Sequence, residues 1–230
     1  MSIADKLTTV TENVEKVYNA GYEKGKSEGG GGVGGILTNY ATLVRFASDE
    51  WAESDTFELN MPNLKSLSAS FNFGFKKIKN LIITSNTPIL ETNDAFYNSG
   101  NNDDTSILEK VVFNVDFSKC KSFARWFRKH TALKTIEGNP LDFSSATQIG
   151  GVFSYCGNIE CFRIVAGSIK ANISFDTNAY LDDITIQSII DGLADLTGGT
   201  AKTVALQKNV KAKLTEEQIA SITSKNWTLA

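Results

Sequence analysis

The feature that most constrains the fold of this chain is a short apolar pattern that recurs from about residue 60 onward. Each copy has an apolar residue, two other residues, a second apolar residue, one other residue and usually a third apolar residue. The copies begin at Leu64, Ile78, Leu108, Leu133, Ile159 and Leu181. The last four steps between them are 30, 25, 26 and 22 residues. Such a unit cannot cover its own apolar face, so neighbouring copies must stack to form a core.

A second element of the pattern fixes the register of the later copies. In three copies a phenylalanine lies six residues before the start, at Phe127, Phe153 and Phe175. Three residues after each phenylalanine comes a small or polar residue, at His130, Cys156 and Asn178. Phe96 and Ser99 fit the same pattern if residues 100–104 form an inserted loop.

These repeats predict an α/β solenoid over residues 36–230, with a C-terminal cap from about residue 190. In each repeat the apolar pattern is expected to form a short strand, and the strands stack in parallel into one sheet. The phenylalanine reaches the core from the opposite side, where loops and short helices connect the strands. The average step of about 26 residues lies within the roughly 20–29 residues typical of leucine-rich repeats.

The composite signature F-x-x-[H/C/N]-x-x-[L/I]-x-x-[I/F] resembles the irregular leucine-rich repeats of the BspA-like group of bacterial surface proteins. The resemblance covers about residues 60–190. The isoleucine–proline pair that usually follows the strand in that group is absent here, and the chain contains only 3 prolines. The resemblance therefore implies the leucine-rich-repeat fold class, with an irregular register.

The C-terminal residues carry capping signals. Thr215 and Gln218 have the spacing of a capping box, which predicts a helix over residues 216–224. Short final strands are predicted at residues 203–206 and 227–229. Trp227 is expected to seal the open end of the core, because a terminal repeat must differ from the others to stay soluble.

The N-terminal residues 1–28 are predicted to form a helix with one apolar seam. The seam residues follow alternating steps of four and three, as in a heptad repeat, and are Ile3, Leu7, Val10, Val14 and Val17. The glycine-rich residues 29–35 form a flexible linker that decouples this helix from the repeats. We therefore expect the helix to assemble with copies of itself or to dock on another protein, rather than to fold back onto its own domain. Alternating residues 40–46 predict a strand that suits an N-terminal cap.

The two ends of the chain resemble tail-associated proteins of phages and prophages from gut bacteria. At the start, the resemblance rests on residues 1–7 (MSIADKL) and 16–21 (KVYNAG). At the end, it rests on residues 214–219 (LTEEQI) and 226–230 (NWTLA). The resemblance implies that the protein is part of a virion, at the phage tail.

Composition and motifs favour a protein that binds without catalysis. The net charge is −3 and no basic stripe could follow phosphates, so we expect no nucleic-acid partner. No segment approaches the ~20 apolar residues of a membrane-spanning helix, and the start lacks a secretory signal. His130 is the only histidine and lies in the polar column of the repeats, where a structural role is expected. The three cysteines lack zinc-ligand spacing. We expect no enzymatic activity, no metal and no cofactor.

The candidate binding surface is the outward face of the predicted strands. Residues that flank the inward apolar positions point outward. These residues are Asn80, Ile82, Lys110, Val112, Thr135, Glu137, Cys161, Arg163, Asp183 and Thr185. Repeat proteins use such extended faces for recognition, although the same composition also suits a merely soluble surface.

These observations lead to a hypothesis with several rivals. The chain is a phage or prophage tail-associated protein that contacts a host surface protein or glycan through its repeats. Its partners are copies of itself, joined through the helix, or other tail proteins. The alternatives are a bacterial cell-surface adhesin, an intracellular protein-interaction scaffold and a glycan-acting enzyme. The last would need two carboxylates facing each other across a groove at ~5–10 Å.

Overall fold

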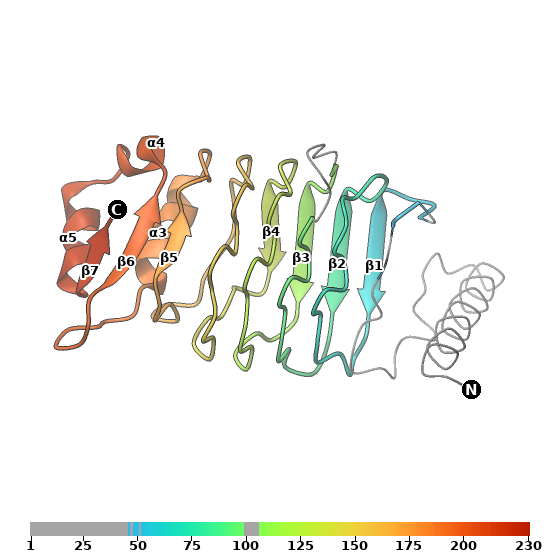
Figure 1. Ribbon diagram of the computed structural model, residues 1–230, viewed down its shortest axis with the longest axis horizontal. Helices are drawn as coiled ribbons and strands as arrows, with labels where there is room; N and C mark the ends of the chain where they lie inside the picture. The colour runs from blue at the N-terminus through green and yellow to red at the C-terminus, as the bar shows by residue number, and fades with distance from the viewer. Residues whose placement is uncertain (1–45, 47, 51, 99–105) are drawn as a thin grey trace, which may run out of the picture.

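The computed structural model describes residues 46, 48–50, 52–98 and 106–230. The predicted N-terminal helix, the glycine-rich linker, residues 40–45 and Ser99 lie outside the described residues. So do the seam residues Ile3, Leu7, Val10, Val14 and Val17. The described residues form two parallel sheets and three short helices, which follow one another along the long axis of the molecule (Figure 1).

The first sheet contains four parallel strands that lie side by side in chain order (Figure 1). The strands are β1 (Thr56–Asn60), β2 (Asn80–Thr84), β3 (Lys110–Asn114) and β4 (Thr135–Gly138). The register aligns Phe57 with Leu81, Leu81 with Val111, and Val111 with Ile136. All four side chains are buried. Because side chains alternate between the two faces of a strand, this register places one face of the sheet in the core and the other outside. The parallel stacking predicted from the repeats is confirmed for β2, β3 and β4.

Three copies of the apolar pattern differ from the strands that they predict. The copy at Leu64 provides only an isolated bridge between Ser66 and Glu91, and the first strand of the sheet is instead β1. The copy at Ile159 provides bridges at Cys161 and Ile164 rather than a continuous strand. Its inward residues are still buried, so the apolar pattern correctly marks the core there.

The copy at Leu181 forms a helix, so the strand predicted there is wrong. Helix α3 (Asp183–Gly192) is N-capped by Asp182, whose side chain accepts a hydrogen bond from the backbone N–H of Thr185 at 2.6 Å. Such an N-cap favours helix over strand. Helix α3 buries Ile186 and Ile190, which are four residues apart and therefore share one helix face.

The C-terminal elements form a second parallel sheet with two more helices, so the single sheet predicted from the repeats is wrong. The elements are β5 (Ile173–Phe175), β6 (Lys202–Leu206), α4 (Lys208–Lys211), α5 (Glu216–Ser224) and β7 (Trp227–Leu229). The sheet order is β5-β6-β7. The predicted capping box is confirmed, because the side chains of Thr215 and Gln218 each bond the other residue's backbone N–H. Trp227 is buried, and its indole N–H donates to the Ala194 carbonyl at 2.8 Å.

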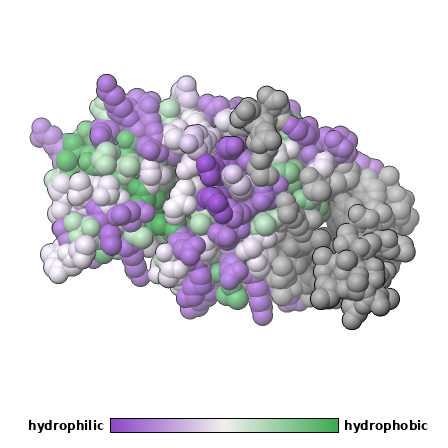
Figure 2. All heavy atoms as spheres, in the orientation of Figure 1, coloured by the Kyte–Doolittle hydropathy of each residue, from purple (hydrophilic) through white to green (hydrophobic). Residues whose placement is uncertain are grey.

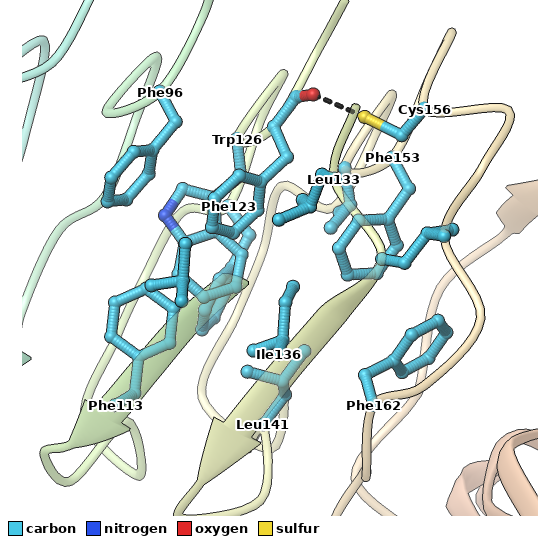
Figure 3. Close-up of a cluster of buried hydrophobic side chains, with 14 of the residues drawn as sticks. Phe96, Phe113, Phe123, Trp126, Leu133, Ile136, Leu141, Phe153, Cys156 and Phe162 are labelled. Carbon is cyan, nitrogen blue, oxygen red and sulfur yellow. Dashed lines mark hydrogen bonds between the residues drawn. The ribbon is translucent and has the colours of Figure 1, made fainter. Parts of the chain in front are cut away.

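A column of stacked phenylalanines runs through the core across successive repeats. Its members are Phe46, Phe71, Phe96, Phe127, Phe153 and Phe175. Neighbouring ring centroids in the column are 4.5–6.1 Å apart. Figure 3 shows the middle of this core, where Trp126 lies among Phe96, Phe113 and Phe123. Burying rings of this size supplies much of the apolar area that holds such a fold together.

The polar column that accompanies the phenylalanines consists of hydrogen-bond donors. His130 Nε2 contacts the Phe96 carbonyl, and Cys156 Sγ contacts the Phe127 carbonyl. Asn178 Nδ2 donates to the Phe153 carbonyl at 3.2 Å. Each residue of the column therefore bonds the phenylalanine carbonyl of the preceding repeat. A histidine, a thiol and an amide are interchangeable here because each carries a donor hydrogen.

Candidate binding surface

The outward side chains of the first sheet form three rows that cross the strands. We call these residues the strand face. The first row contains Thr56, Asn80, Lys110 and Thr135. The second contains Glu58, Ile82, Val112 and Glu137. The third contains Asn60, Thr84 and Asn114. The rows are straight because each strand pairs with the next in the same register.

Side-chain contacts hold the polar members of the strand face in place. Asn80 Nδ2 donates to Thr56 Oγ1 at 3.2 Å in the first row. Asn114 Nδ2 donates to Thr84 Oγ1 at 3.3 Å in the third row. An ion pair of 2.6 Å joins Lys110 Nζ to Glu137 Oε2. Its partners are 38% and 46% exposed, so it contributes at most about 1 kcal/mol to stability. Its stronger effect is to orient two charges on the surface.

The centre of the strand face is apolar. Ile82 and Val112 lie next to each other on β2 and β3, and both are half-buried. Glu58 and Glu137 end the same row on β1 and β4. The row therefore presents an apolar pair between two carboxylates. Such a pattern matches a partner with an apolar centre and polar or basic groups on either side.

Six of the ten predicted binding residues lie together on the strand face, namely Asn80, Ile82, Lys110, Val112, Thr135 and Glu137. Cys161 pairs with Thr135 of β4 only through an isolated bridge. Arg163 lies beyond β4, and its guanidinium donates to the Phe162 carbonyl at 2.7 Å and to Thr185 Oγ1 at 3.0 Å. Those bonds tie its side chain to its own segment and to α3.

Two predicted binding residues, Asp183 and Thr185, lie in a helix rather than on a strand, which corrects the sequence prediction. Asp183 is in the first turn of α3. Thr185 is fully buried, and its hydroxyl bonds the backbone of Phe162. The predicted inward residue Ile184 is instead 63% exposed. The helix reverses these positions because its period of 3.6 residues replaces the alternation of a strand.

The sequence analysis missed the contribution of β1 to the strand face. Thr56, Glu58 and Asn60 are exposed, whereas Phe57 and Leu59 between them are buried. This alternation is the ordinary signature of a half-buried strand. It was hidden because the repeat pattern requires an apolar residue three positions before Phe57, where the chain has Ser54.

The histidine and two of the cysteines lie in the core. Besides its contact with the Phe96 carbonyl, His130 has Nδ1 at 2.8 Å from Ser106 Oγ. A carbonyl only accepts, so Nε2 carries the hydrogen that bonds the Phe96 carbonyl. Cys120 is fully buried, and burial raises the pKa of its thiol to about 11. These contacts place His130 in the hydrogen-bond network of the core.

Figure 2 shows a mostly hydrophilic surface in this view, with hydrophobic patches toward the end that carries the C-terminal sheet. Among the residues that the structure describes, no three His, Cys, Asp or Glu side chains gather as a metal centre requires. The helices in the same residue ranges are too short or too polar to cross a membrane.

Comparisons with known proteins identify no relative. No protein-family model matches the chain, and no curated protein or solved structure gives a significant match.

Proposed function

We propose that this chain is a non-catalytic binding module that recognises its partner through the strand face. The observation that carries the proposal is the second row, in which Ile82 and Val112 form an apolar pair between Glu58 and Glu137. Interfaces typically place apolar residues at the centre and polar residues at the rim. The side-chain bonds on the flanking rows favour binding, because groups that are already ordered lose less entropy when a partner docks.

The architecture that we propose for the module is an α/β solenoid of irregular leucine-rich repeats over residues 36–230, capped from about residue 190. Three observations support it: the parallel strands in chain order, the phenylalanine column and the donor that bonds each preceding repeat. A helix over residues 1–28 and a linker over residues 29–35 would precede it.

We place the module at a phage or prophage tail, in contact with a host surface protein or glycan. This placement rests on the resemblance of the two chain ends to tail-associated proteins. The helix would join several copies, or attach the module to other tail proteins. Several copies on one particle raise the overall strength of binding without any new contact, because each later contact forms within an already bound particle.

The strand face is tested by Val112→Glu, which places a third carboxylate at the centre of the second row. Fluorescently labelled protein would be measured by flow cytometry against a panel of intact gut bacteria. Each buried charge that lacks a partner weakens an interface by several kcal/mol. We therefore expect V112E to reduce binding to the recognised strain by at least about tenfold.

Leu90→Glu is the matched control. Leu90 is 43% exposed and lies outside the strands of the first sheet, so the same chemical change there leaves the strand face intact. Both variants should keep the thermal midpoint of the parent, which separates lost binding from lost folding. Equal binding by V112E, L90E and the parent would show that the strand face is not the contact surface.

A further inference from the structure

A second surface, away from the strand face, gathers aromatic and cationic side chains from three successive repeats. Tyr97 and Arg128 each directly follow a phenylalanine of the core column, and Tyr155 lies two residues after the next one. The backbone links the three turns, because the Asn98 N–H donates to the Arg128 carbonyl at 3.1 Å and the Lys129 N–H donates to the Ser154 carbonyl at 3.0 Å. We call Tyr97, Arg128 and Tyr155 the tyrosine–arginine cluster.

The guanidinium of Arg128 is held between the two tyrosines. Its central carbon lies 5.5 Å from the ring centroid of Tyr97 and 5.5 Å from that of Tyr155. Both distances are within the ~6 Å range of a cation–π contact. Arg125 also lies over Tyr97, at 5.6 Å, but it is paired with Asp94 at 2.7 Å. Arg128 therefore occupies the centre of the cluster.

Arg128 has no anionic partner among the described residues 46, 48–50, 52–98 and 106–230. The Nε of Arg128 is buried, and no atom of the described residues accepts a hydrogen bond from it. The tyrosine rings orient the guanidinium, and a planar guanidinium binds a carboxylate through two parallel N–H bonds along its edge.

The surroundings of the cluster favour an acidic ligand that also has an apolar face. Lys129 adds a positive charge next to Arg128, while Asp94 is paired with Arg125. Tyr155 is 55% exposed, so one side of its ring is open to a flat ligand. A sugar unit with a carboxylate offers both features, because its C–H face can stack on a ring while the acid binds arginine.

We propose that the tyrosine–arginine cluster binds acidic carbohydrate, one carboxylate-bearing sugar unit at Arg128 with its ring against Tyr155. This site is separate from the strand face and stands or falls independently of it. A purely structural role, in which Arg128 only ties the three repeats together, would leave carbohydrate binding unaffected by changes in the cluster.

The test measures binding of a galacturonic acid tetramer to the full-length protein by isothermal titration calorimetry. The methyl-esterified tetramer keeps the sugar rings and lacks the charges. We expect the acid to bind at least about tenfold more tightly than the ester, because a hydrogen bond to a charged group is worth ~1.5–3 kcal/mol. Arg128→Gln should remove this preference. Lys119→Gln, which also removes one positive charge but from an exposed site elsewhere, should not.

Three results would overturn the proposal. They are equal binding of acid and ester, full binding by R128Q, and binding of a glutamic acid tetramer as tight as that of the sugar acid. If R128Q fails to fold, Tyr155→Ala replaces it, since that side chain is largely in solvent. Y155A is expected to weaken binding of the sugar acid and to leave the weak binding of the glutamate peptide unchanged. Unchanged binding of the sugar acid by Y155A would also contradict the proposal.

Discussion

Replacing Phe127 by alanine tests whether the phenylalanine column holds the repeats together. The ring is fully buried and stacks on Phe96 at 4.5 Å and on Phe153 at 6.1 Å. It also contacts Trp126 at 4.7 Å. Removing a buried phenylalanine destabilises a protein by ~3–5 kcal/mol, through lost apolar burial and the cavity that remains.

For a domain of this size, 1 kcal/mol corresponds to roughly 2–4 °C in the thermal midpoint. Phe127→Ala should therefore lower the midpoint by about 6–20 °C. Circular dichroism on heating measures it, with Tyr155→Ala as the control because that ring is 55% exposed. The control should shift the midpoint by about 4 °C or less. A shift for F127A no larger than that of Y155A would refute the role of the column.

Three further predictions concern stability. In denaturant titrations, Gly138→Ala should lower the free energy of unfolding by ~1–3 kcal/mol more than Gly167→Ala does. Both glycines have positive φ, but of the two only Gly138 would bring a new Cβ into overlap with a carbonyl of β3. Equal losses would contradict this. The raised pKa of Cys120 means that the folded state holds its proton more tightly than the unfolded state. Stability should fall as pH rises from about 9 to about 11, more in the parent than in Cys120→Ala; parallel curves would contradict it. Asp182→Ala should cost ~0.5–2 kcal/mol by removing the N-cap of α3, whereas no change in the denaturation midpoint would rule out that cap.

The sequence was most informative where the alternation of a strand and the repeat period agree. At β2 and β3 the inward residues Leu81, Ile83, Val111 and Phe113 follow both rules, and all are buried. At Leu181 the apolar spacing is also compatible with a helix, and the N-cap of Asp182 favours the helix. The apolar pattern alone does not show that a helix competes with a strand at this site, so it predicts Asp183 and Thr185 on a strand rather than on α3.

The phenylalanine column extends further than the sequence pattern indicated. Phe71 and Phe46 continue it toward the N-terminus, yet the apolar pattern that should follow Phe71 by six residues is shifted by one, to Ile78. The tyrosine–arginine cluster is only partly predictable from the sequence, because Tyr97 and Arg128 each follow a phenylalanine of the column but nothing in the pattern shows that their side chains meet. Its residues are 31 and 27 positions apart, and their contact depends on how the three turns align.

The donor role of the polar column was also hidden in the sequence. Histidine, cysteine and asparagine share little in size or polarity, so their alignment suggests only tolerance. The structure shows that each bonds a carbonyl of the preceding repeat. What the position requires is a donor hydrogen in the right place, which a comparison of residue types does not reveal.

The mass of the full-length protein in solution tests most directly whether the chain presents its binding surface in several copies. Light scattering would compare the parent with a seam variant that carries both Leu7→Asp and Val14→Asp. The control, Thr8→Asp with Thr9→Asp, adds the same charges to the other side of the predicted helix. We predict a dimer or trimer for the parent and the control, and a monomer of about 25.0 kDa for the seam variant. A parent that is already monomeric, or a seam variant that keeps the parent's mass, would contradict it.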